Sequence, residues 1–333
     1  MTKRITISDV AIHAGVSKST VSQYLNGRYD YMGQKTKEKI ESAIKELKYS
    51  PNMVARSLKQ KSSTTIGVIV ANILHVFSTQ VIRAIEDFCH EKGFHVIVCN
   101  ADDNSDKEKT YIDMLRAKQV DGIIAFPTGD NVALYQGLLE EKYPLVFMDR
   151  LVDGLDIPTV LLDNYKAATL AVDLLKDYQR PAIVTSPLKE NLTPRMERLF
   201  GFKNELAKHG KSLSDEYIAC GEINEIQKKL TELFQLSEPP DAIFAINDRV
   251  LHEVLSFMNY QNIRIPDDVS LVNVDDVSFA EFYQPALTTI SQPAFEMGKK
   301  AAELLFTQIK NPQDISTRET FRFEPMVNRR KSC

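Results

Sequence analysis

The residues of this chain with the clearest chemical potential are small polar and cationic side chains gathered in the stretch 6–26, TISDVAIHAGVSKSTVSQYLN. Such side chains donate hydrogen bonds to phosphates and contact the edges of bases in a DNA groove. The candidate DNA-contacting residues are Thr6, Ser17, Lys18, Ser19, Thr20, Ser22, Gln23 and Asn26. An ordinary helical hairpin at the edge of a larger domain could carry the same residues, so their chemistry alone leaves both interpretations open.

The spacing within this stretch predicts two short helices joined by a tight turn. Thr6 and Asp9 fit a capping box that begins the first helix, and Gly15 suits the left-handed conformation that ends it. Ser17 is then placed to cap the second helix. Apolar residues recur at helical spacing: Ile7, Val10, Ala11, Ala14, Val21 and Leu25. The pattern is typical of a helix-turn-helix.

A third helix is predicted over 34–48, which would let the three helices close a small core. Its apolar stripe is Ile40, Ala43, Ile44 and Leu47, and lysines occupy its other faces. Charge is distributed unevenly along the chain. Residues 1–62 contain 12 Lys and Arg against 5 Asp and Glu, a net +7, whereas the remainder contains 29 against 40, a net −11. A polyanion should therefore bind the first 62 residues and be repelled by the rest.

Two signatures point to a family. The chain carries D-V-A-x-x-A-G-V-S-x-x-T-V-S-x-x-L-N at 9–26 and P-N-x-x-A-R-S-L at 51–58, and in this it resembles the LacI/GalR family of bacterial repressors. The resemblance implies that the segment 51–58, too short to be stable as an isolated helix, folds when two copies meet over the minor groove of a palindromic operator. It adds Asn52, Ala55, Arg56 and Leu58 to the DNA-contacting residues, with Leu58 wedged into a base step.

Beyond a polar linker, strand-like and helix-like segments alternate in a pattern that occurs twice. Strands such as TIGVIVA at 65–71 and DAIFAI at 241–246 predict two consecutive parallel lobes. With the resemblance, the expected fold is an all-α helix-turn-helix headpiece plus an α/β periplasmic-binding-protein-like core of two doubly wound parallel-sheet lobes. The expected domains are a DNA-binding domain at 1–50, a hinge helix and linker at 51–62, and an effector-binding and dimerisation core at 63–333. That core divides into an N-lobe at about 63–163 and 293–325 and a C-lobe at about 164–292.

Polar and aromatic side chains follow several of the predicted strands. In open α/β lobes small ligands bind beyond the carboxyl ends of strands, so these side chains predict a ligand cleft. With the family resemblance, the candidate effector-binding residues are Phe77, Arg150, Arg195, Arg198, Asn247 and Asp275. Two of the assignments have competing interpretations: Arg198 could form a salt bridge on a helix face, and Asp248, beside Asn247, could cap the helix that follows.

Three arginines near one cleft indicate an acidic ligand, because a buried guanidinium needs an anionic or strongly accepting partner. Within the family the chain resembles repressors of 2-keto-3-deoxygluconate catabolism. The expected effector is therefore a small sugar acid of that kind, acting as an inducer that releases operator DNA. A protein co-effector, a neutral sugar or a purine stays open as the alternative. The tail 324–333 lacks the heptads of a coiled coil, which favours a homodimer.

An enzyme is the rival interpretation of a doubly wound sheet, and the motifs disfavour it. The first strand-to-helix turn, GVIVANILHVFSTQ at 67–80, contains neither G-x-G-x-x-G nor a P-loop. Asp275 and Asp276 are adjacent, and neighbouring side chains on an extended strand point apart, so they make a poor acid–base pair. The four cysteines show no CxxC spacing, so no metal or cofactor is expected. With no signal peptide and no apolar run near ~18 residues, a cytoplasmic protein without a membrane partner is expected.

Overall fold

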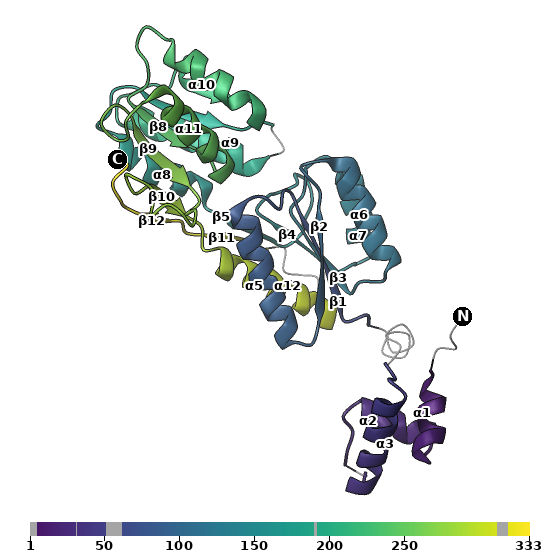
Figure 1. The fold of residues 1–333 in the computed structure, drawn as a ribbon. Helices are drawn as coiled ribbons and strands as arrows, with labels where there is room; N and C mark the ends of the chain where they lie inside the picture. The colour runs from purple at the N-terminus through teal and green to yellow at the C-terminus, as the bar shows by residue number, and fades with distance from the viewer. Residues whose placement is uncertain (1–4, 31, 51–61, 190–191, 312–318) are drawn as a thin grey trace. The chain divides into compact units, whose positions relative to one another are not determined.

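The computed structural model describes residues 5–30, 32–50, 62–189, 192–311 and 319–333. The chain forms two compact units, Met1–Ser63 and Thr64–Cys333, which are called here the headpiece and the core (Figure 1). In the described residues, no helix combines the length and the apolar character needed to cross a membrane.

The headpiece contains α1 (Ile7–Ala14), α2 (Lys18–Leu25) and α3 (Gln34–Glu46). Val10, Val21 and Ile40, one from each helix, are fully buried at the centre of its small apolar cluster. The helix predicted to reach Lys48 ends at Glu46, because Lys48 takes a left-handed conformation with φ of 47°, which does not continue an α-helix.

The predicted ends of the first two helices are confirmed. The Thr6 N–H donates to Asp9 Oδ2 at 2.8 Å and the Asp9 N–H donates to Thr6 Oγ1 at 3.4 Å, which is the capping box. Gly15 follows α1 with φ of 64°, and Ser17 Oγ accepts from the Thr20 N–H at 3.1 Å at the start of α2. These local bonds satisfy backbone groups that a helix end would otherwise leave free.

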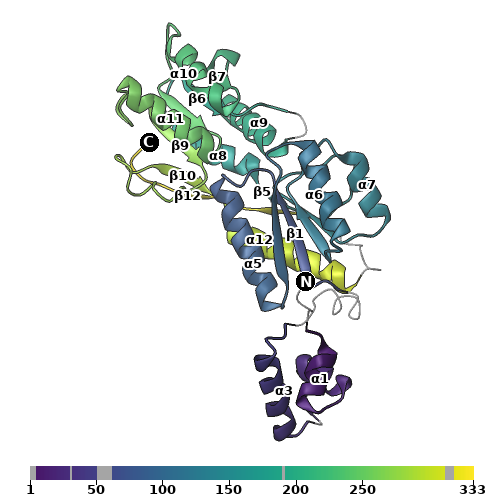
Figure 2. The same cartoon turned by 45° about the vertical axis from the view of Figure 1, so that its right-hand side comes forward.

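The first lobe of the core contains a six-stranded parallel sheet in the order β11-β5-β4-β3-β1-β2. Its strands are β1 (Thr65–Val70), β2 (His95–Asn100), β3 (Gly122–Ala125), β4 (Leu145–Met148), β5 (Thr159–Leu162) and β11 (Thr320–Phe323). One face is covered by α5 (Val76–Glu91) and α12 (Ala294–Lys310), and the other by α6 (Ser105–Ala117) and α7 (Val132–Glu140) (Figure 2).

The second lobe repeats this architecture with a sheet in the order β12-β10-β9-β8-β6-β7, in which only the β10–β12 pair is antiparallel. Its strands are β6 (Pro181–Thr185), β7 (Ile218–Cys220), β8 (Ala242–Ala245), β9 (Ser270–Val274), β10 (Thr288–Ser291) and β12 (Met326–Asn328). One face packs against α8 (Asn164–Leu175) and α9 (Thr193–Lys208), and the other against α10 (Ile226–Phe234) and α11 (Asp248–Gln261). The two-lobe fold predicted from the sequence is confirmed.

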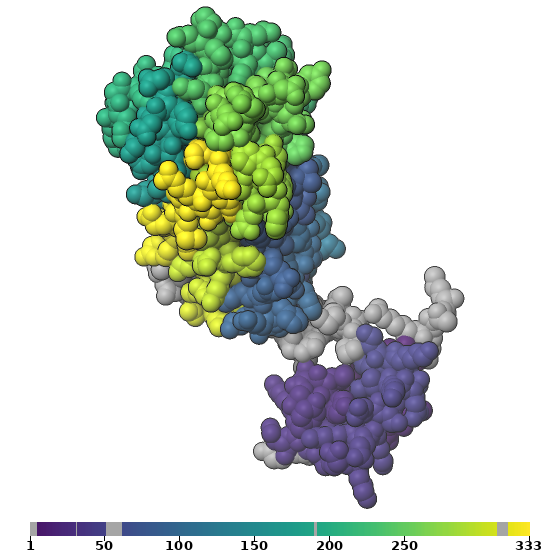
Figure 3. All heavy atoms as spheres, turned by 60° about the vertical axis from the view of Figure 1, so that its left-hand side comes forward, coloured from purple at the N-terminus to yellow at the C-terminus, as the bar shows by residue number. Residues whose placement is uncertain are grey.

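The chain passes between the two sheets after β5, after β10 and after β11. As a result, its C-terminal residues, yellow in Figure 3, lie against both the blue first lobe and the green second lobe. Sequence analysis missed β7, α10, β10 and β12. Three of these are strands of three or four residues, too short to show a clear hydrophobic pattern.

Candidate functional site

The second helix of the headpiece presents the side chains expected to contact DNA. Lys18, Ser19 and Gln23 are exposed on α2, whereas its Val21 is buried. Among the described residues, the side chains of Lys18 and Gln23 make no hydrogen bond or ion pair within the protein. Because no internal partner has to be given up, both are available to bind bases or phosphates.

The other candidates on the headpiece already have local roles. Thr6 belongs to the capping box, and Ser17 Oγ lies 2.7 Å from Ser19 Oγ and 2.8 Å from Thr20 Oγ1. Asn26 Nδ2 donates to the Ser22 carbonyl at 2.7 Å, at the end of α2. These hydrogen bonds stabilise the ends of α1 and α2, and they engage side-chain groups that would otherwise be free to bind DNA. The remaining candidates, Asn52, Ala55, Arg56 and Leu58, lie outside the described residues.

The six effector-binding candidates, which the sequence spreads over 199 positions, meet in one cavity of about 50 Å³ between the two lobes of the core. It is called here the inner cavity. Its lining includes all six: Phe77, Arg150, Arg195, Arg198, Asn247 and Asp275. The first two come from the first lobe and the other four from the second. The rings of Phe77 and Phe126 meet edge-on, with their centroids 6.3 Å apart. Both residues line the cavity and give it an apolar surface beside the polar groups.

Two of the three arginines are already paired inside the protein. Arg150 Nη1 lies 2.6 Å from Asp103 Oδ1, and Arg195 Nη2 donates to Asp103 Oδ2 at 3.2 Å. Burial alone would raise the pKa of Asp103, but the two guanidiniums outweigh it and hold that pKa below its usual value. The argument that these arginines require an acidic ligand is therefore corrected, because Asp103 supplies their anionic partner.

Arg198 lies in α9 and is buried. Its hydrogen-bond partners differ from those of the other two arginines. Its Nε donates to Asn164 Oδ1 at 2.8 Å and its Nη1 donates to the Ile246 carbonyl at 2.7 Å. Only 5% of its surface is exposed, so the competing interpretation of a surface salt bridge is wrong. Asn164 Nδ2 in turn donates to Glu197 at 3.1 Å, and Glu197 pairs with Arg322 of β11 at 2.7 Å. These contacts connect Arg198 of the second lobe to β11 of the first lobe.

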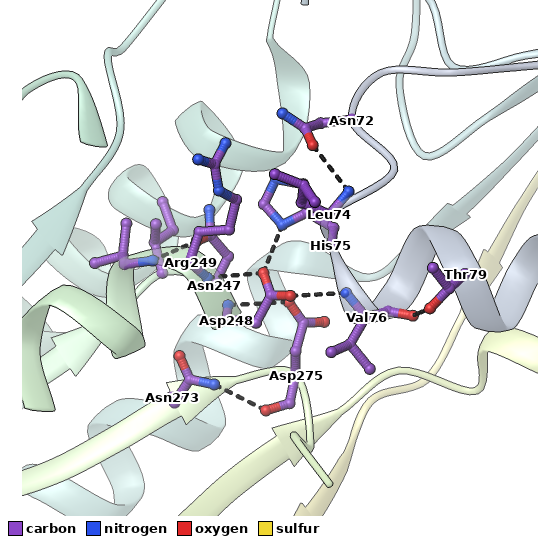
Figure 4. A network of polar contacts seen from close by, with 12 residues as sticks. Asn72, Leu74, His75, Val76, Thr79, Asn247, Asp248, Arg249, Asn273 and Asp275 are labelled. Atoms are coloured by element: carbon purple, nitrogen blue, oxygen red, sulfur yellow. Dashed lines mark hydrogen bonds and ion pairs between the residues drawn. The ribbon is translucent and has the colours of Figure 1, made fainter. Parts of the chain in front are cut away.

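The carboxylate of Asp248 joins the two lobes directly, as Figure 4 shows. Its Oδ1 lies 2.5 Å from His75 Nδ1, and its Oδ2 accepts from the Val76 N–H at 2.7 Å at the start of α5. The competing interpretation of Asp248 as a helix cap is wrong, because the N-cap of α11 is Asn247, whose Oδ1 accepts from the Val250 N–H at 2.9 Å. The Asp248 carboxylate, from the second lobe, therefore bonds two neighbouring residues of the first lobe across the cleft.

Asp275 lies at the bottom of the cleft, beside Asp248. Its Oδ1 accepts from Gln292 Nε2 at 2.6 Å, and burial together with the charge of Asp248 raises its pKa to about 6. Asp276 points the other way and pairs with Arg330 at 2.8 Å. The prediction that these adjacent carboxylates point apart is confirmed.

Sequence reasoning missed Asp103, Gln292 and Asn164 as members of this site. Asp103 follows β2 and Asn164 follows β5, so their position after a strand was a usable signal. In the described residues no group of His, Cys, Asp and Glu is arranged to hold a metal ion. What the cleft offers is a mixture of buried donors and acceptors beside an aromatic ring.

Comparison with known proteins accounts for both parts of the chain. The family described as "Bacterial regulatory proteins, lacI family" matches residues 6–52, and "Periplasmic binding proteins and sugar binding domain of LacI family" matches residues 63–323. The probable HTH-type transcriptional regulator EndR of Paenibacillus polymyxa is 48% identical over 332 residues, with 98% of each chain covered. The HTH-type transcriptional regulator KdgR of Bacillus subtilis is 33% identical over 342 residues, covering 99% of this chain and 98% of KdgR.

A solved structure shows the same architecture. The lac repressor dimer bound to operator and the anti-inducer ONPF matches with a TM-score of 0.85 at 26% identity, over 99% of each chain. The relatives that match are transcriptional regulators, in agreement with the helix-turn-helix signature and the basic headpiece. The chain therefore belongs to the LacI family and is a DNA-binding transcriptional repressor.

Proposed function

We propose that this repressor controls a carbohydrate catabolic operon and leaves its operator when a sugar binds between the two lobes of the core. The observation that carries the proposal is the position of Arg198 and Asp275, both buried and both lining the inner cavity. A hydroxyl between them would accept a hydrogen bond from the guanidinium and donate one to the carboxylate. Asn247 and the ring of Phe77 supply a further polar contact and an apolar face.

For the effector itself we propose a small sugar acid, such as 2-keto-3-deoxygluconate. The support comes from Arg198, because among the described residues its guanidinium donates hydrogen bonds only to neutral acceptors. A ligand carboxylate would add a charged acceptor that bonds the guanidinium directly, and such bonds are stronger than bonds to neutral acceptors. Arg150 and Arg195 line the same cavity, but Asp103 already serves as their anionic partner, so the proposal does not depend on them.

A neutral sugar is the second candidate, and the charge balance around Asp103 favours it. Because that carboxylate already faces Arg150 and Arg195, the inner cavity contains no excess of cations that a ligand must neutralise. Hydroxyl groups can use the same donors and acceptors without adding charge.

On the DNA side we propose that α2 enters the major groove, with Lys18 and Ser19 at its start and Gln23 one turn further on meeting base edges. Glutamine can pair bidentately with adenine, so Gln23 should favour adenine at one operator position. We further propose a homodimer in which 51–62 forms the hinge and linker between a DNA-binding domain at 1–50 and the core at 63–333. Leu58 would then wedge into the minor groove.

Operator release tests this proposal. Duplexes selected by the purified protein from a random pool serve as operator, and gel-shift titrations with sugars and sugar acids measure release. Arg198→Ala should bind operator as the wild type does but need on the order of tenfold more effector, because it loses hydrogen bonds from a charged donor. Arg116→Ala, on the surface of α6, is the matched control and should behave as the wild type. Release of the Arg198→Ala complex at the wild-type concentration would contradict the assignment.

A further inference from the structure

A second cavity of about 180 Å³, called here the outer cavity, adjoins the inner one. The two cavities share His75, Leu192 and Arg195 in their linings, so they are neighbouring parts of one cleft. Both lobes contribute to the outer cavity: Asp102, Asp103 and Thr128 come from the first, and Ser186, Glu222 and Arg249 from the second. Of the residues named here as lining only this cavity, the proposed function uses Asp103 alone, as the partner of Arg150 and Arg195.

The volumes of the two cavities differ in a way that bears on ligand size. The inner cavity has a volume of about 50 Å³. The outer cavity is more than three times as large. A sugar anchored at Arg198 can extend from the inner cavity into the outer cavity or into a third cavity of about 190 Å³, which shares Phe77, Asp275 and Gln292 with the inner one. The side chains of these two larger cavities decide between the directions.

Arg249 gives the outer cavity a hydrogen-bonding group with no internal task. Its backbone N–H donates to Asp248 Oδ1 at 2.8 Å, but within the described part of the chain its guanidinium has no hydrogen bond or ion pair. Figure 4 shows this side chain extending away from Asp248 on the side of His75. The carboxylates of Asp102, from the first lobe, and Glu222, from the second, line the same cavity and offer acceptors. A cationic donor together with carboxylate acceptors suits a group rich in hydroxyls, each of which donates and accepts.

We infer that the effector is an oligosaccharide of at least two sugar units, with one end at Arg198 and Asp275 in the inner cavity and the next unit in the outer cavity against Arg249. This inference rests on the proposed carbohydrate effector and names its size. It holds whether or not the inner end carries a carboxylate, because Arg249 contacts only the second unit.

A panel that varies length and charge independently tests the inference. Glucose and cellobiose form the neutral pair, gluconate and cellobionate form the acidic pair, and 2-keto-3-deoxygluconate and digalacturonate extend the acidic series. Thermal shift ranks them with the full-length protein, since a ligand of the folded state raises the melting temperature, and calorimetry measures Kd. At least one two-unit sugar should bind about tenfold or more tightly than its one-unit partner, because it gains a hydrogen bond from a charged donor.

Two variants locate the second unit. Arg249→Ala should remove about tenfold of the affinity for the two-unit sugar and leave the one-unit sugar within twofold, as expected for one charged hydrogen bond. Gln80→Ala is the matched control, because Gln80 lines a different cavity of about 190 Å³ on the other side of Asp275 and Gln292. Weaker binding in Gln80→Ala but not in Arg249→Ala would overturn the placement.

The remaining outcomes separate this inference from the proposed function. If one-unit sugars or sugar acids bind as tightly as their longer partners, the oligosaccharide inference fails and the carbohydrate effector stands. If no sugar of either length or charge binds, both fail. Unchanged binding of the two-unit sugar by both variants would also contradict a second unit in the outer cavity.

Discussion

The headpiece and the cleft of the core are held together by contacts of very different range. The caps of the headpiece join residues three apart, such as Thr6 with Asp9 and Ser17 with Thr20. The cleft depends on His75 bonding Asp248, 173 positions away, and on Asp103 bonding Arg195, 92 positions away. The ends of the headpiece helices are therefore determined by a few neighbouring residues, whereas the cleft depends on the whole fold of the core.

The largest effect should come from the shared carboxylate in the cleft. Asp103→Ala should lower the free energy of unfolding of the core by about 3 kcal/mol, because it removes the carboxylate shared by two poorly solvated guanidiniums. Arg150 would keep its longer ion pair with Asp149, at 3.9 Å. Side-chain exposure is only 7% for Arg150 and 14% for Arg195. Urea denaturation followed by circular dichroism would measure the change, since the chain has no tryptophan.

The neighbouring residue provides a control for that measurement. Asp102 pairs with Lys107, and both side chains are about half exposed. Asp102→Ala should change the free energy of unfolding by less than about 1 kcal/mol, as is usual for surface ion pairs. Equal losses of unfolding free energy in the two variants would show that the ion pairs of Asp103 stabilise the core no more than the surface pair of Asp102 does.

An effect of at most the same size should appear as a pH dependence. The pKa of Asp275 is raised to about 6, so between about pH 4 and pH 6 the folded protein holds a proton that the unfolded chain has released. Stability should therefore fall as pH rises through this window and level off above it, by up to about 3 kcal/mol. Asp275→Asn should flatten the slope in urea titrations at a series of pH values.

Asp276→Asn serves as the comparison for this titration. The Arg330 ion pair overcomes a burial effect in the opposite direction and lowers the pKa of Asp276, so its contribution to stability is lost only below about pH 4. The variant should keep the wild-type slope between pH 4 and pH 6. A slope in that window that survives Asp275→Asn but disappears in Asp276→Asn would reverse the assignment.

The smallest of these effects should come from a local cap. Ser17→Ala should destabilise the headpiece by about 1 kcal/mol, because the Thr20 N–H loses its acceptor at the start of α2. Hydrogen exchange of headpiece amides in the full-length protein would detect it. Ser42→Ala, on the exposed face of α3, should have little effect, and similar exchange in both variants would count against the cap.

The range of the contacts also explains what the sequence could predict. The capping box, Gly15 and the Ser17 cap follow from residues within one turn of each other, so they were predicted and are confirmed. The two-lobe fold followed from repeated buried strands. The pairing of Asp103 with two arginines could not be predicted, because strand order and lobe closure decide which side chains meet. The short strands β7, β10 and β12 were missed since their partners, more than their own patterns, hold them in the sheet.

The central claim is that the headpiece binds operator DNA and the cleft of the core binds the sugar. One anisotropy assay tests this claim most directly. Labelled operator is titrated with wild type, Gln23→Ala and Arg198→Ala, and each complex is then titrated with the sugar that releases the wild type. Gln23→Ala should weaken operator binding by roughly 1 to 3 kcal/mol and leave the half-releasing sugar concentration unchanged. Arg198→Ala should leave operator affinity unchanged and raise that concentration at least about tenfold. The claim would be contradicted if either variant changed operator affinity and the half-releasing sugar concentration by equal factors. It would also be contradicted if Gln23→Ala left operator affinity unchanged and Arg198→Ala left the half-releasing concentration unchanged.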